Sequence, residues 1–117
     1  MAGAVIQAGG AYLIVRRKAE GLLGGLWEFP SGRVESGESH AAALKRIGRE
    51  LLGVSLRPGG LVASVDHAYS HFRITLTMYR AVIVRGEPGP RAHDALTWAA
   101  KDAFGAYAFP KANHKFL

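Results

Sequence analysis

Apolar and polar residues alternate over several short stretches of this chain, as expected for β-strands that bury one face. The clearest stretch spans residues 72–84, where only Arg80 interrupts the apolar face. Between the first two stretches stands Gly9-Gly10, a pair typical of a two-residue hairpin. Residues 57–60 (RPGG) predict a turn before the longer strands. The predicted strands cover residues 4–8, 12–17, 26–29, 61–68, 72–84 and 96–99.

Between these strands the spacing changes to that of one prominent helix. Leu44, Gly48 and Leu52 follow each other at i, i+4 and i+8, so they form one stripe that can pack on a sheet. Ser39 is a good N-cap and Gly53 a good stop signal, which places the helix at about residues 40–52. Gly48 costs the helix about 1 kcal/mol relative to alanine, which favours close backbone packing there.

Composition predicts a single domain of the α/β class, spanning residues 1–117. Nearly half of the residues are hydrophobic, enough for one core. A short helix is expected from Lys101 and a basic helical turn after Pro110. The sheet is predicted to be mixed, with the central helix and the short C-terminal helices beside it.

The charge balance bears on partners and location. The net charge is +6, which favours acidic partners such as nucleic acid, although a soluble protein can also simply be basic. No cysteine is present, which excludes disulfides and iron–sulfur ligation by this chain and fits the cytoplasm, including the bacterial nucleoid. No apolar run is long enough for a membrane span, and we expect a monomer.

A motif with fixed spacing covers the predicted helix and the loop before it. Gly32 is followed after five residues by Glu38, and Arg46 follows after seven more; Glu50 and Gly53 keep the remaining spacing. This pattern resembles the Nudix box, the pyrophosphate-cleaving motif of the Nudix family. The resemblance implies a Nudix fold, in which these five residues form the scaffold of the box.

Most of the box carboxylates are missing from this chain. They would fall at positions 47, 50 and 51, on one face of the helix, but here those residues are Ile47, Glu50 and Leu51. Pyrophosphate cleavage uses Mg²⁺, which prefers carboxylate and water oxygens. One carboxylate among several cations is a poor Mg²⁺ site, so no metal ligands are predicted. Glu50 and Mg²⁺ matter only if the chain is a hydrolase.

The lost ligands leave Ile47 and Leu51 as a second apolar stripe on the helix. Two explanations are open: a neighbouring loop covers this face, or another protein domain contacts it. Glu38, in the preceding loop, is placed to pair with Arg46 and hold the loop to the helix.

Three further segments carry a narrower resemblance. They are residues 22–30 (LLGGLWEFP), 67–76 (HAYSHFRITL) and 109–115 (FPKANHK). Together with the box they resemble the C-terminal, Nudix-like domain of MutY-type adenine-DNA glycosylases. The first segment is also found in Nudix enzymes that cleave oxidised purine nucleotides.

This resemblance implies a non-catalytic DNA-recognition domain that senses 8-oxoguanine opposite adenine in base excision repair. Its partners would be double-stranded DNA containing 8-oxoguanine and a missing N-terminal glycosylase domain. That domain would carry the hydrolase activity and the iron–sulfur cluster; the domain in hand would need no cofactor.

The resemblance also selects residues for the DNA contact. Ser70 is the first choice for the lesion, since its hydroxyl can both donate and accept a hydrogen bond. Tyr69 is expected to wedge or stack at the base step, and His71 to orient the loop or contact a phosphate. Each of these can equally be an ordinary turn or packing residue. The candidate phosphate contacts are Arg73, Lys111 and Lys115.

Two other functions compete with DNA recognition. The overall box spacing and Glu50 favour a free-standing Nudix hydrolase that cleaves oxidised purine nucleoside triphosphates. The stripe of Ile47 and Leu51 favours a protein-interaction module.

Overall fold

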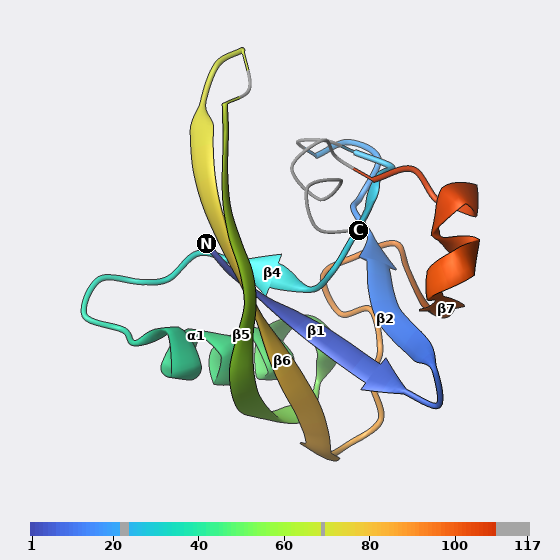
Figure 1. Ribbon diagram of the computed structural model, residues 1–117, viewed down its shortest axis with the longest axis horizontal. Helices are drawn as coiled ribbons and strands as arrows, with labels where there is room; N and C mark the ends of the chain where they lie inside the picture. Colours follow the sequence, from blue (N-terminus) through green and yellow to red (C-terminus); the bar gives the residue numbers. More distant parts are fainter. Residues whose placement is uncertain (22–23, 69, 110–117) are drawn as a thin grey trace.

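The computed structural model describes residues 1–21, 24–68 and 70–109, and Figure 1 shows the order of its helices and strands. The elements are β1 (Ala2–Ala8), β2 (Ala11–Arg16), β3 (Trp27–Glu28), β4 (Ser31–Gly32), α1 (His40–Ile47), the π-helical turn η1 (Gly48–Leu52), β5 (Ser55–Ala68), β6 (Arg73–Arg85), β7 (Ala95–Ala100) and the 3₁₀ helix η2 (Lys101–Ala106).

The strands form one mixed sheet in the order β3-β2-β1-β6-β5, with β4 paired to β1 and β7 paired to β2. β1 runs parallel to β6 and antiparallel to β2. β5 and β6 form a long antiparallel hairpin, whose tip projects beyond the rest of the molecule (Figure 1). The predicted α/β class with a mixed sheet is therefore confirmed.

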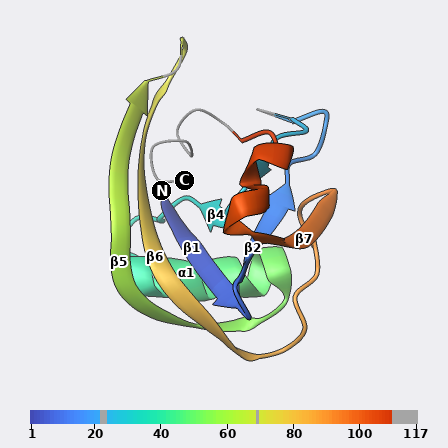
Figure 2. The ribbon, with the colours of Figure 1, turned by 45° about the vertical axis from the view of Figure 1, so that its right-hand side comes forward.

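Two hydrophobic clusters cover the two faces of this sheet. On one face, Leu44 of α1 and Leu52 of η1 pack against β1, β2 and β5. On the other face, Phe104 of η2 packs against Phe29 and Phe109. Figure 2 shows α1 behind the strands and η2 in front of them. The molecule thus has three layers, and the box helix belongs to only one side of the sheet.

The central helix follows the sequence prediction with one change. The Ser39 hydroxyl caps its start by accepting a hydrogen bond from the Ala42 amide at 3.1 Å. From Gly48 the helix continues as the wider turn η1, which Gly53 ends with a φ of 71°. A Cβ atom at Gly48 would lie 2.6 Å from Leu56 Cγ, so the predicted close packing at this glycine is confirmed.

The predicted turn at residues 57–60 is wrong. β5 begins at Ser55 and runs through Pro58, with shifts of register between Pro58 and Leu61 and between Leu61 and Ala63. β5 is an edge strand of the described sheet. The missing amide proton of a proline therefore removes no hydrogen bond to a further strand there. The strand continues through the two glycines after Pro58.

Two expectations concern the ends of the chain and the membrane. The basic helical turn expected after Pro110 lies outside the described residues. In the part of the chain that the structure describes, no helix is both long and apolar enough to cross a membrane.

Candidate functional site

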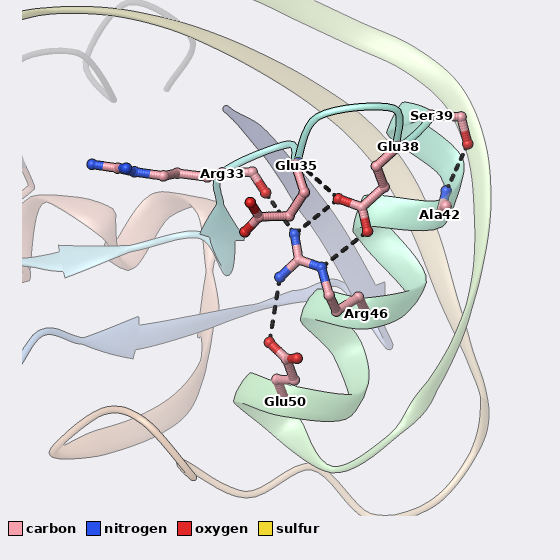
Figure 3. A network of polar contacts seen from close by, with 7 residues as sticks. All are labelled: Arg33, Glu35, Glu38, Ser39, Ala42, Arg46 and Glu50. Atoms are coloured by element: carbon pink, nitrogen blue, oxygen red, sulfur yellow. Dashed lines mark hydrogen bonds and ion pairs between the residues drawn. The ribbon is translucent and has the colours of Figure 1, made fainter.

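Arg46 is the centre of the box loop and helix (Figure 3). Its guanidinium donates two hydrogen bonds to Glu38, Nε to Oε2 and Nη2 to Oε1, both at 3.0 Å. Nη2 also donates to the Arg33 carbonyl oxygen at 2.6 Å, and Nη1 to Glu50 Oε2 at 3.3 Å. The predicted pairing of Glu38 with Arg46 is confirmed. The arginine ties the loop, the first turn of the motif and the helix into one unit.

Hydrogen bonding fixes the charges of this unit. The Arg46 guanidinium and then the Glu35 amide, which donates to Glu38 Oε1 at 2.9 Å, hold the pKa of the Glu38 carboxyl below its ordinary value. The hydrogen bond to Glu38 in turn raises the pKa of Arg46. Both groups are therefore charged at neutral pH, and the loop is held in one conformation before any ligand binds.

The second apolar stripe of the helix is covered by the molecule itself. Ile47 is 1% exposed and lies under β4, where a Cβ atom at Gly32 would come within 3.2 Å of Ile47 Cγ1. Leu51 is half-buried against the main hydrophobic cluster, and its carbonyl oxygen accepts a hydrogen bond from the Arg91 amide. Of the two explanations for this stripe, coverage by a neighbouring segment is correct for Ile47, which β4 covers, and only in part for Leu51. A protein-interaction module that uses Ile47 would need this side chain exposed, and it is buried.

The described box residues do not fit a resident Mg²⁺ ion. Glu50 is the one carboxylate at the three ligand positions; its side chain is 60% exposed and already pairs with Arg46. Among residues 1–21, 24–68 and 70–109, no three histidine, aspartate or glutamate side chains gather closely enough to hold a metal ion. Mg²⁺ sites need hard oxygen donors that are not neutralised by neighbouring cations. We therefore assign no step of a reaction to a metal held by these residues.

A cavity of about 260 Å³ opens beside the helix end, and sequence reasoning missed it. Leu51 forms part of its wall, and Arg17 and Lys18 line it on another side. Deeper in it, Glu28 is 5% exposed and pairs with two partners, Arg17 Nη1 at 2.8 Å and His93 Nε2 at 3.0 Å. The cavity thus combines a buried carboxylate with two cationic side chains, of which Arg17 is paired with that carboxylate.

His93 adds an unsatisfied polar atom to this cavity. Its side chain is 8% exposed, and Nδ1 is buried without a hydrogen-bond partner among the described residues. If Nε2 donates to Glu28, Nδ1 of the neutral ring carries a lone pair that can accept a hydrogen bond. A buried polar atom without a partner costs free energy, and a ligand in the cavity would supply the partner. A charged residue inside the apolar run WEFP was the one sequence signal for this cluster.

The hairpin residues lie far from the box. Ser70 and His71 are exposed at the tip, and Arg73 is exposed where β6 begins, paired in register with Ala68. In both ribbon views this end of the hairpin points away from α1 (Figures 1 and 2). Of the remaining candidates, Tyr69, Lys111 and Lys115 lie outside the described residues.

Comparison with known proteins places the whole chain in one family. A model of the NUDIX domain matches residues 1–117. CTP pyrophosphohydrolase of Escherichia coli is 33% identical over 114 residues, which are 97% of this chain and 84% of that protein. A putative 8-oxo-dGTP diphosphatase 2 of Mycobacterium tuberculosis is 36% identical over 84% of this chain and 70% of its own length.

Solved structures agree with this match. The MutT NUDIX hydrolase of Burkholderia pseudomallei superposes with a TM-score of 0.81 at 29% identity, over 98% of this chain and 89% of its own. The solution structure of the E. coli ORF135 protein gives a TM-score of 0.80 at 30% identity, over 98% and 82%. The predicted Nudix fold is confirmed.

The interpretation as a DNA-recognition domain of an adenine-DNA glycosylase is wrong. The human adenine DNA glycosylase is 31% identical over 92% of this chain, but the match covers only 20% of the glycosylase. The hydrolases above match over most of their own length. The segments that carried the narrower resemblance build the shared fold instead: Phe29 and Phe109 pack in the core, and Leu76 lies in the same cluster.

The NUDIX match spans every residue, and the scaffold positions of the box, from Gly32 to Gly53, keep the spacing and contacts that hold its loop to its helix. This chain belongs to the Nudix family.

Proposed function

We propose that this protein is a nucleotide-directed Nudix hydrolase that cleaves oxidised purine nucleoside triphosphates. The observation that carries the proposal is the similarity, over most of both chains, to proteins named as a CTP pyrophosphohydrolase and a putative 8-oxo-dGTP diphosphatase. A recognition domain cut from a larger repair enzyme has no such support.

The cavity beside the box helix supports binding of a triphosphate. Arg17 and Lys18 line it, and guanidinium and ammonium groups are the usual protein partners of phosphate oxygens. Glu28 holds Arg17 in place through a 2.8 Å ion pair. His93 Nδ1 offers one further polar contact to a bound ligand.

The carboxylate positions of the box helix predict slow turnover. Ile47 and Leu51 provide no oxygen atoms at two of the three carboxylate positions, and Glu50 shares its charge with Arg46. Glu50 is exposed on the box helix and is the carboxylate on which hydrolysis depends in this proposal. We expect nucleotide binding that is readily measured and a rate of cleavage far below that of a Nudix enzyme with three carboxylates.

The test is release of pyrophosphate from a panel of nucleoside triphosphates, with and without oxidised purines, in the presence of Mg²⁺. We expect release from an oxidised purine triphosphate, and its loss in Glu50→Gln. Glu87→Gln, at an exposed glutamate outside the box, is the matched control and should keep the activity. The proposal would be contradicted if the protein neither bound nor cleaved any triphosphate. It would also be contradicted if Glu50→Gln kept the activity.

A further inference from the structure

A second cavity lies where the box helix ends, and it is unusually rich in arginine. It has a volume of about 270 Å³ and is lined by Arg49 of η1, Arg85 at the end of β6 and Arg91 in the loop before β7. Ser55 adds a hydroxyl group, and no carboxylate is among the described residues that line the cavity. The end of the box helix and the stretch from Arg85 to Arg91 thus bring three positive charges to one hollow.

Among the described residues, none of these three arginines forms an ion pair with a carboxylate. Within the described residues, the salt bridges of arginine side chains involve Arg17 and Arg46, and none involves the three arginines of this cavity. All three are exposed. Like charges that converge without a counter-ion repel one another, so a bound anion would relieve an unfavourable arrangement.

Glycine backbone makes room for one of the guanidinium groups. The Arg91 guanidinium lies against Gly53, where a Cβ atom would come within 2.6 Å of Arg91 Cζ. Gly86 lies close by, since its own Cβ atom would be 3.1 Å from the Gly53 carbonyl oxygen. Both glycines have positive φ, 71° and 97°, a conformation that other residues rarely adopt. The floor of the cavity is therefore bare backbone.

The loop that carries Arg91 is itself fastened to the helix. The Gly89 amide donates to the Leu52 carbonyl oxygen at 3.0 Å, and the Arg91 amide donates to the Leu51 carbonyl oxygen at 3.1 Å. These bonds use carbonyl groups that a helix end otherwise leaves unpaired. They hold the Cα atom of Arg91 beside the cavity before a ligand arrives.

A structural role at the helix end accounts for Arg49 and in part for Arg91, whose guanidinium lies against the C-cap Gly53, but not for Arg85. Arg49 lies in the last turn of the helix, where a cation interacts favourably with the helix dipole. Arg85 and Arg91 come from a strand and a loop, and neither donates a hydrogen bond to the helix end through its side chain among the described residues.

We propose that Arg49, Arg85 and Arg91 form a binding site for a short phosphate chain, with inorganic pyrophosphate as its smallest well-matched ligand. One guanidinium group can donate two parallel hydrogen bonds to two oxygens of a phosphate. Three guanidinium groups therefore offer more donors than the oxygens of a single phosphate can accept in good geometry. A diphosphate supplies more oxygens and more negative charge. The site shares no lining residue with the cavity of Arg17 and His93, and it does not rest on the proposed function.

Calorimetric titration of the full chain with pyrophosphate, at low salt and without Mg²⁺, tests the site. We expect Arg91→Gln and Arg85→Gln each to weaken binding about tenfold, because each removes charge-assisted hydrogen bonds. The matched control is Arg57→Gln, at an exposed arginine of β5 that does not line the cavity; it should weaken binding by less than about twofold. Thermal unfolding of each variant shows that the fold is kept.

Two further arms separate the sources of phosphate. Amide resonances of Gly53 and Gly86 should shift with pyrophosphate, and a nucleoside triphosphate should compete for the same shifts through its phosphate chain. Arg17→Gln should leave the shifts unchanged, which distinguishes this site from the proposed hydrolase cavity. Equal loss of affinity in Arg57→Gln and Arg91→Gln would overturn the proposal. So would binding of duplex DNA without any binding of pyrophosphate.

Discussion

Two neighbouring arginines of the box helix are used in opposite ways. Arg46, in the last turn of α1, donates hydrogen bonds to Glu38, the Arg33 carbonyl oxygen and Glu50. Arg49, in η1, joins Arg85 and Arg91 around a cavity without a carboxylate among the described lining residues. The first arrangement stabilises the fold, and the second leaves charge available to a ligand. Arg46 and Arg49 both belong to the box helix, so a place in the motif does not by itself separate a scaffold arginine from one available to a ligand.

The largest expected effect comes from restoring a lost carboxylate inside the scaffold. Ile47→Glu should lower the free energy of unfolding by about 3–5 kcal/mol, because it buries a charge, and the adjacent Arg46 is already paired with Glu38. Urea unfolding measures this loss, with Ile47→Val as the control at about 0.5–1.5 kcal/mol. Unchanged stability, together with new Mg²⁺ binding, would show that β4 moves aside and that the scaffold is less rigid than its contacts imply.

A smaller loss is expected where the helix meets β5. Gly48→Ala should cost about 1–3 kcal/mol of unfolding free energy, since the new methyl group collides with Leu56 despite the better helix propensity of alanine. Gly105→Ala is the matched control: a Cβ atom there has no neighbour within 4 Å, so the variant should be as stable as the wild type or slightly more so. Equal effects of the two changes would mean that β5 shifts to accommodate the new methyl group at position 48.

Acid should weaken the contact between Glu38 and Arg46. The pKa of Glu38 is lowered by Arg46, so the carboxylate binds a proton more readily in the unfolded chain than in the folded one. Its contribution to stability is complete above the ordinary glutamate pKa and is lost as pH falls through the lowered value. Unfolding midpoints in urea at pH 6 and pH 3 should therefore differ more for the wild type than for Glu38→Gln. Parallel changes in both proteins would remove Glu38 as the cause.

The smallest effect on stability is expected at Arg91, in the loop before β7. Arg91→Gln should change the free energy of unfolding by less than about 0.5 kcal/mol, because its exposed side chain has no ion pair among the described residues. Its effect should appear in anion binding instead. A clear loss of stability in the absence of any anion would make Arg91 part of the scaffold and erase the contrast with Arg46.

Local chemistry explains what the sequence could predict. Alternation of side chains located the strands, Ser39 and Gly53 set the helix ends, and the spacing of Glu38 and Arg46 predicted their pairing. Each of these features depends on residues close together in the chain. The turn predicted at residues 57–60 failed because the position of Pro58 on an edge strand depends on how the whole sheet is ordered.

The candidate sites could not be predicted in the same way. Arg17, Glu28 and His93 meet only because β2, β3 and the loop before β7 come together, and no short motif encodes that meeting. The functional assignment failed for a related reason. Residues 26–30 and 72–76 contribute Phe29 and Leu76 to the core, so we read their likeness to glycosylases as shared architecture and not as a shared substrate.

The bulged outer strand has a consequence for behaviour in concentrated solution. An open β edge can recruit a strand from another molecule, and Leu61 and Val62 make this edge apolar, with 63% and 41% of their surface exposed. Pro58 lacks an amide proton, and the register shifts on either side of Leu61 interrupt any regular ladder. The irregularity that hid the first part of this strand from sequence prediction is therefore expected to protect the folded protein from aggregation through its edge.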